Sequence, residues 1–185
     1  MRAKPLPIAD ERLIALAREH GTPLFVYDAA TIRARVAELR GRFDVIRYAQ
    51  KANSNPALLA LVRAEGCAID AVSAGEVERA LEAGFAADEI VFTSDVFDRA
   101  ALACLARHRV RVNLGSLDML EQYAALGVGR EVTLRVNPGF GAGHSSGVTT
   151  GGELSKHGIW HAQLSEALER ARAAKLVVNG LHVHA

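Results

Sequence analysis

Val45-Ile46-Arg47-Tyr48-Ala49-Gln50-Lys51-Ala52-Asn53-Ser54-Asn55-Pro56 begins as an apolar, β-prone run and ends in a polar turn. Asn55 and Pro56 suit the N-cap and the first position of a helix. The stretch therefore predicts a strand that ends at Lys51, then a short loop and a helix. In α/β folds such a strand-to-helix loop is where catalytic side chains lie, although a lysine there can also simply extend into solvent.

A strand followed by a helix then recurs at a spacing of roughly twenty residues, which is typical of a repeated supersecondary unit. Capping signals help to place the helices: Ser73, with Glu76 three residues later, predicts a helix start. Two helices (about 10–19 and 29–39) and a strand or extended segment (23–28) precede the repeats. We predict strands at 45–51, 68–72, 90–93, 110–114, 132–137 and 176–184. We predict one helix that begins at residue 55 and further helices at 73–84, 98–107, 116–126 and 162–174.

Apolar strands that alternate with single helices indicate a parallel sheet covered by helices. Polar residues collect at the C-terminal ends of the predicted strands, where (β/α) barrels carry their sites. We therefore predict an α/β fold, a TIM-type (β/α) barrel with about six of its eight strands present; a doubly wound sheet is the alternative. Residues 1–22 are expected to be a lead-in and residues 23–185 a partial barrel domain. The polar strand-end residues are Lys51, Ser73, Thr93, Asn113, Arg135, Asn137, His182 and His184.

Composition excludes several classes of function. The 185-residue chain is 50% hydrophobic and has a formal net charge of +1, so it shows no electrostatic footprint for nucleic acid or a membrane surface. Its first residues carry no apolar signal-peptide region, and no run approaches the ~18 apolar residues of a membrane span. Cys67 and Cys104 are isolated in apolar surroundings and match no metal-site spacing, as expected of reduced core thiols. We expect a cytoplasmic globular protein.

Three motif-like patterns fit their usual functions poorly. Gly143-His144-Ser145-Ser146-Gly147 matches the hydrolase nucleophile elbow, but it does not lie directly between a strand and a helix. Gly139-Phe140-Gly141-Ala142-Gly143 lacks the dinucleotide-binding spacing and a following helix. His182 and His184 share one face of a strand, as metal ligands can, yet such a pair without further ligands more often stacks or forms hydrogen bonds. We therefore predict no hydrolase, dinucleotide or metal site.

Lys51 is the preferred candidate for chemistry. Neighbouring strands offer a carboxylate (Asp70), a guanidinium (Arg135) and imidazoles, all expected at one mouth of the barrel. A lysine in such a pocket can be a neutral nucleophile and bond covalently to a carbonyl group. Lys156 is the competing candidate, because a lysine in its Gly-rich loop can meet a substrate or a partner chain.

Five motifs, in the family's order, resemble those of the fold type III pyridoxal-phosphate-dependent decarboxylases. Tyr48-Ala49-Gln50-Lys51-Ala52-Asn53-Ser54-Asn55 resembles the cofactor-lysine motif, and Ile69-Asp70-Ala71-Val72-Ser73-Ala74-Gly75-Glu76 the second-strand motif. Three more look like the diaminopimelate decarboxylase branch: Leu134-Arg135-Val136-Asn137-Pro138-Gly139, Ser155-Lys156-His157-Gly158-Ile159 and Leu181-His182-Val183-His184. The resemblance runs from about Thr22 to the last residue.

The resemblance implies a set of roles. Lys51 would carry pyridoxal 5'-phosphate covalently, and His184, rather than His182, would stack on the pyridine ring. Asp70 and Arg135 would belong to the network around the cofactor. It also implies a small amino-acid substrate and a homodimer in the full-length form.

The implied reaction is decarboxylation of meso-2,6-diaminopimelate to L-lysine, in lysine biosynthesis. Ser146-Gly147-Val148-Thr149 and Leu154 depart from the branch, which leaves the substrate contacts open. The family's Gly-Ser-Gly, its phosphate loop and its C-terminal β-domain would follow Ala185, so the 185-residue chain is expected to be a truncated form that does not decarboxylate. The alternatives are a decarboxylase of another basic amino acid or a polyamine precursor, and a non-catalytic relative that binds a partner chain.

Overall fold

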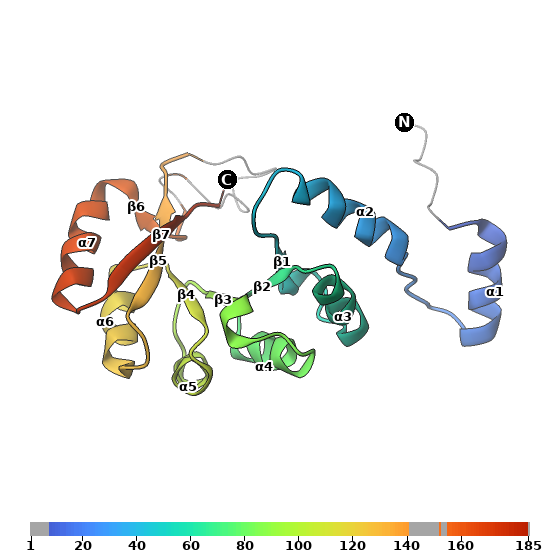
Figure 1. Cartoon of the computed structure of the whole chain (residues 1–185), viewed down its shortest axis with the longest axis horizontal. Coiled ribbons are helices and arrows are strands. Elements are labelled where there is room, and N and C mark those ends of the chain that lie inside the picture. The colour runs from blue at the N-terminus through green and yellow to red at the C-terminus, as the bar shows by residue number, and fades with distance from the viewer. Residues whose placement is uncertain (1–7, 141–151, 153–154, 185) are drawn as a thin grey trace.

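Seven parallel strands form one open sheet in the computed structural model, which describes residues 8–140, 152 and 155–184 (Figure 1). The first five strands lie in chain order, and β5 then pairs with two others: with β7 along residues 131–135 and with β6 at residues 136–137. Every strand pair is parallel. The strands are β1 (Arg47–Ala49), β2 (Ala68–Ala71), β3 (Ile90–Thr93), β4 (Arg111–Leu114), β5 (Glu131–Asn137), β6 (Ile159–Trp160) and β7 (Val177–His182).

Helices cover the outer side of this sheet, as Figure 1 shows for α3 to α7. The core fills the space between the two layers, and its largest fully buried side chains include Leu59, Ile69, Phe92, Leu120 and Leu134. The helices are α1 (Asp10–His20), α2 (Ala29–Arg40), α3 (Pro56–Ala64), α4 (Ala74–Glu82), α5 (Arg99–His108), α6 (Leu117–Leu126) and α7 (Leu164–Ala173), with short 3-10 turns η1 (Gln50–Ala52), η2 (Ala87–Glu89) and η4 (His161–Gln163).

Polar side chains fix where five of the helices begin. Asp28, Asn55, Ser73, Asp98 and Ser116 each accept a backbone N–H from the first turn of α2, α3, α4, α5 and α6. Such a cap typically stabilises a helix by about 1 kcal/mol. The helix starts predicted at Asn55, Ser73 and Ser116 are therefore confirmed.

The predicted fold class is confirmed, since the described chain is a parallel α/β sheet with the open form of a partial barrel. Within the described residues, β1 pairs only with β2, and β6 and β7 each pair only with β5, so the sheet is not closed. In the part of the chain that the structure describes, no helix is long and apolar enough to cross a membrane.

Several expected boundaries change. The strand predicted to reach Lys51 ends at Ala49, and Lys51 lies in the turn η1. Segment 23–28, predicted to be a strand or an extended lead-in, forms no strand. Strand β6 was not predicted, because a two-residue strand leaves no apolar periodicity to detect. Helix α1 buries none of its residues, and the division between a lead-in and a barrel domain at residue 22 stays a prediction.

Several patterns from the sequence fall outside the described residues. They are the elbow-like 143–147, the greater part of the glycine pattern 139–143, and the departures from the family at 146–149 and Leu154.

Candidate functional site

A cavity of about 270 Å³ lies at the C-terminal ends of the strands. Parallel α/β sheets bind their ligands at this edge, because the strand-to-helix loops meet there. Strands β2, β3, β5 and β7, the segments that directly follow strands, and the segment before β6 line it: Lys51, Asp70, Val72, Thr93, Ser94, Asp95, Arg135, His157, His182 and His184.

A network of local hydrogen bonds shapes the turn that presents Lys51. The Tyr48 hydroxyl donates to the Asn53 carbonyl at 3.0 Å, and the Ser54 hydroxyl donates to the Gln50 carbonyl at 3.2 Å. The Asn53 side chain also accepts the backbone N–H of Asn55, directly before α3. Burial raises the pKa of the Tyr48 hydroxyl, so this group stays a donor. These contacts hold the chain reversal that places Lys51 at the cavity.

A chain of three side chains on adjacent strands holds Asp70. The Asn113 amide on β4 donates to the Thr93 hydroxyl on β3 at 2.7 Å, and that hydroxyl donates to Asp70 Oδ1 on β2 at 2.5 Å. Thr93 and Asn113 are buried. Because buried polar groups are costly unless they are paired, these two hydrogen bonds fix one orientation of the Asp70 carboxylate.

A carboxylate between two basic groups forms the opposite wall. Arg135 Nη1 donates to Asp95 Oδ1 at 2.8 Å, and His157 Nδ1 lies 2.7 Å from Asp95 Oδ2. The second contact has ion-pair proximity but not the direction of a hydrogen bond, since His157 Nδ1 has no hydrogen-bond partner in the described chain. The Arg135 side chain is only 9% exposed, so Asp95 compensates a guanidinium largely removed from water.

Gly158 allows the backbone to pass this wall closely. Its φ is +81°, and a Cβ there would lie 3.0 Å from the backbone nitrogen of Asn137 and 3.1 Å from the carbonyl oxygen of Arg135. Glycine alone tolerates both the backbone angle and this approach. It thereby lets the segment that carries His157 lie directly against the end of β5.

His182 at the end of β7 and His184 just after it face the same cavity. Burial lowers the pKa of His182, and the nearby Arg135 lowers it further. The pKa of His184 is also lowered, first by burial and then by the charges of Arg135 and Lys51. His182 Nδ1 is buried without a hydrogen-bond partner among the described residues. Both rings therefore favour the neutral form.

The structure brings all four predicted site residues to one cavity: Lys51, Asp70, Arg135 and His184. Lys156 is exposed and does not line it. None of the cavity histidines belongs to a group of metal-ligating side chains within the described residues. Whether His184 rather than His182 meets a cofactor ring stays a prediction, since both line the cavity.

Two other predicted strand-end residues have structural roles, and two cavity residues were not predicted from the sequence. Ser73 caps α4, and Asn137 binds the backbone of Gly139 and Gly152. Asp95 and His157 were not predicted as site residues. The position of Asp95, two residues after β3, was a usable signal, because side chains there reach the same edge as those at the strand ends.

Comparison with known proteins identifies the family. Residues 29–185 match the family described as "Pyridoxal-dependent decarboxylase, pyridoxal binding domain". The chain belongs to this family. Its membership confirms the resemblance found in the sequence and supports a pyridoxal cofactor.

Individual relatives narrow the branch. A diaminopimelate decarboxylase of Streptomyces coelicolor is 53% identical over 177 residues, which cover 94% of this chain and 40% of that protein. A crystal structure of a diaminopimelate decarboxylase superposes with a TM-score of 0.87 at 48% identity, covering 94% of this chain and 42% of the other. The Helicobacter pylori diaminopimelate decarboxylase complexed with L-lysine gives a TM-score of 0.84 at 26% identity, covering 93% and 46%. The chain thus spans about two fifths of the length of the relatives it matches.

Proposed function

We propose that this chain supplies the lysine-bearing part of a pyridoxal-phosphate-dependent decarboxylase that converts meso-2,6-diaminopimelate to L-lysine and carbon dioxide. The observation that carries the proposal is the convergence of Lys51, Asp70, Arg135 and His184 on one cavity at the C-terminal edge of a parallel sheet. The names of the relatives supply the substrate. Pyridoxal phosphate, when bound, withdraws the electron pair released as a carboxylate leaves the α-carbon.

The residues present fit this cofactor. An aldehyde, an anionic phosphate and an aromatic ring require an amine, positive charge and a flat side chain, which Lys51, Arg135 and the histidines provide. The cavity volume of about 270 Å³ is close to the low end, about 300 Å³, of small-molecule sites. The unpartnered Nδ1 of His182 leaves hydrogen-bonding capacity at the cavity within the described chain.

Each residue then has a distinct task. Lys51 binds the cofactor through its amine, and His184 stacks on its ring in the neutral form that its lowered pKa favours. Asp70, held by Thr93, offers a carboxylate of fixed orientation in the same cavity as Lys51. Arg135, held by Asp95, offers a fixed positive charge that attracts the cofactor or the substrate carboxylate.

Borohydride reduction in the presence of pyridoxal phosphate tests the assignment of Lys51. After reduction and peptide mapping, we expect the label on Lys51, and we expect Lys51→Arg to lose it. Lys156→Arg is the matched control and should be labelled like the original chain. Label on Lys156 with Lys51 unmodified would overturn the assignment.

Substrate identity needs a separate measurement, on a chain extended to the length of the relatives. We expect carbon dioxide release from meso-diaminopimelate and at least about tenfold less from L-lysine, L-ornithine and L-arginine. These three amino acids lack the second carboxylate of diaminopimelate, so the buried polar groups of a site that binds this carboxylate would be left without partners. Preferred turnover of one of the others would support the alternative, a decarboxylase of another basic amino acid.

Assembly and location complete the proposal. We assign the full-length form to a cytoplasmic homodimer; both cysteines are free and buried within the described residues, which suits a reducing compartment. Analytical ultracentrifugation of the extended chain should give twice the monomer mass. A monomer that decarboxylates at the full rate would remove the dimer from the proposal.

A further inference from the structure

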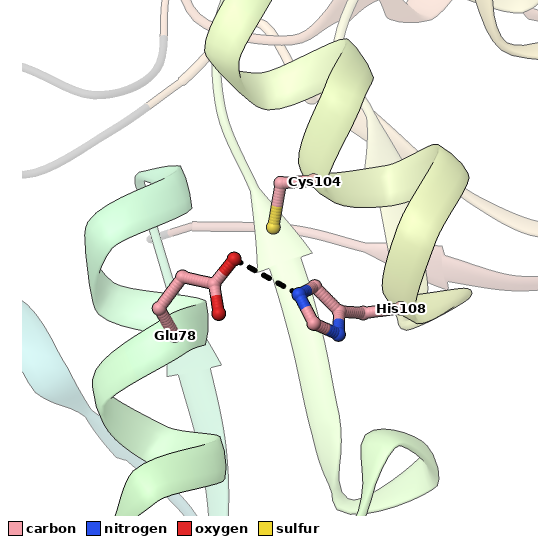
Figure 2. Close-up of side chains that lie close together, drawn as sticks. All are labelled: Glu78, Cys104 and His108. Atoms are coloured by element: carbon pink, nitrogen blue, oxygen red, sulfur yellow. Dashed lines mark hydrogen bonds and ion pairs between the residues drawn. The ribbon is translucent and has the colours of Figure 1, made fainter.

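Three side chains that bind metals in many proteins meet between α4 and α5, away from the cavity. They are Glu78 on α4 and Cys104 and His108 on α5, shown in Figure 2. One ligand atom from each lies within 4.8 Å of the others. None of the three lines the cavity that contains Lys51.

The helix geometry explains the cluster. Cys104 and His108 are four residues apart, so they project from the same face of α5. Helix α4 packs beside that face and brings Glu78 to it, and His108 Nε2 lies 2.9 Å from Glu78 Oε1. The prediction of no metal site rested on the isolation of Cys67 and Cys104 in the sequence, and the approach of Glu78 to Cys104 and His108 arises only when α4 packs against α5.

We propose that Glu78, Cys104 and His108 form a binding site for a zinc-like divalent cation that joins α4 to α5. A thiolate, an imidazole and one carboxylate form a donor set that suits zinc or cobalt rather than magnesium or calcium, which require mostly oxygen ligands. Structural and catalytic zinc sites are both tetrahedral, so three protein ligands leave one position for water.

The distances require only small adjustments. Zinc bonds of about 2.0–2.3 Å place tetrahedral ligand atoms about 3.3–3.7 Å apart. The His108–Glu78 contact is shorter than this and the cluster's 4.8 Å limit is longer, so side-chain rotation on two rigid helices suffices. On binding, the His108–Glu78 hydrogen bond breaks: neutral His108 ligates the cation through Nε2 and carries its proton on Nδ1, Glu78 ligates as a carboxylate, and the Cys104 thiol proton leaves to solvent.

The three proposed ligands differ in how far they are exposed to solvent. Cys104 is 4% exposed, and burial raises the pKa of its thiol, so it is not reactive without a metal. The Glu78 side chain is 43% exposed and His108 is 20% exposed, so an ion and its water can enter from that side. Arg107 Nη1 lies 3.6 Å from Glu78 Oε1 and competes with the ion for the carboxylate, but its side chain is 71% exposed and can turn into solvent.

Cobalt titration of the reduced, purified chain tests the site, because a cobalt–thiolate bond has a near-ultraviolet charge-transfer band. We expect the band to appear with a stoichiometry of one, to disappear when zinc is added, and to be absent in Cys104→Ser. Cys67→Ser is the matched control, since Cys67 is also buried and free, and it should keep the band. His108→Asn removes a direct ligand and should weaken cobalt binding by more than the roughly tenfold that loss of an outer-shell partner alone costs.

Arg107→Gln separates a metal site from an ordinary ion pair between helices. The substitution removes the Arg107 charge that competes for Glu78, so it should tighten cobalt binding. If Glu78 only forms ion pairs between the helices, the same substitution would instead lower stability and leave cobalt binding unchanged. Zinc should also raise the thermal midpoint of the original chain and of Cys67→Ser, but not that of Cys104→Ser. The proposal is wrong if folded chain gives no thiolate band, or if Cys104→Ser keeps it. Circular dichroism of each variant without metal confirms that it is folded.

Discussion

Asp95 shows how one carboxylate can set two neighbouring groups at the site. It contacts both Arg135, whose side chain is 9% exposed, and His157. We expect Asp95→Asn to lower the free energy of unfolding by about 1–3 kcal/mol, because a largely buried guanidinium loses its charged partner. The loss should be smaller than the roughly 3–5 kcal/mol of a fully buried pair, because Asp95 is partly solvated.

Urea denaturation measures this loss, with Glu121→Gln as the matched control. Glu121 pairs with Arg170 at 3.2 Å on the exposed surface, so its loss should cost less than about 1 kcal/mol. Equal losses in the two variants would mean that burial of Arg135 does not matter energetically.

His182 predicts a pH dependence. Its pKa lies below the ordinary value of 6.5, chiefly through burial, so the unfolded chain takes up this proton more readily than the folded one. The contribution of His182 is constant above about pH 6.5, and the free energy of unfolding then falls as the pH drops toward the folded pKa.

Denaturation at pH values from 8 down to 5 should show this loss, and His182→Gln should lose less stability over the same range. Nuclear magnetic resonance titration should give His182 a pKa below 6.5. A profile that the substitution leaves unchanged would show that His182 is as well solvated in the folded chain as in the unfolded one.

At the scale of elements, the close approach of the segment before β6 to the end of β5 depends on Gly158. We expect Gly158→Ala to cost about 1–3 kcal/mol of stability, because a Cβ would strain a backbone at φ +81° and meet backbone atoms at 3.0–3.1 Å. The same change should also reduce labelling of Lys51 in the borohydride experiment. It would push the segment that carries His157 away from the end of β5 and so distort the cavity that His157, Arg135 and Lys51 line.

Gly127→Ala is the control for this element. Gly127 also has a positive φ, +64°, but nothing lies within 4 Å of the place that a Cβ would occupy. It should therefore cost only about 1 kcal/mol and leave the labelling unchanged. A larger loss in Gly127→Ala than in Gly158→Ala would contradict the role given to the close approach.

At the scale of the whole molecule, the open sheet limits what the 185-residue chain can do. Strands β1 and β7, which each have a single partner strand, lead to Lys51 and carry or precede the two histidines, so the cavity wall between them is not closed by strand pairing in the described chain. Strand β7 also leaves apolar side chains uncovered: Val177 is 53% exposed and Leu181 61%. Unpaired edges of this kind invite association.

We therefore expect the purified chain not to release carbon dioxide from meso-diaminopimelate, while a chain extended to the length of its relatives does. The physical reason is that decarboxylation needs a cofactor held and tuned by the protein, and an open cavity lets water compete with both functions. Side-by-side measurement of carbon dioxide release decides this. Comparable turnover by the shorter chain would mean that the described cavity is sufficient for catalysis.

The sequence by itself predicted the repeating architecture and gathered the candidate site residues at one edge of the sheet. Apolar periodicity and side-chain caps act over a few residues, so every strand except the two-residue β6, and the helix starts at Asn55, Ser73 and Ser116, could be predicted locally. Parallel strands share one C-terminal edge, which is why Asp70, Arg135 and His184 could be assigned to the same mouth before any distance was known.

Only the tertiary structure decided the contacts between residues distant in sequence. The pairing of Asp95 with Arg135 spans forty residues, and the meeting of Glu78 with His108 spans thirty. Neither leaves a periodic signal, because each depends on how two separate units pack against each other. Local order followed from local chemistry, whereas the charge partners at the cavity and the cluster between α4 and α5 exist only once the sheet has assembled and brought its helices side by side.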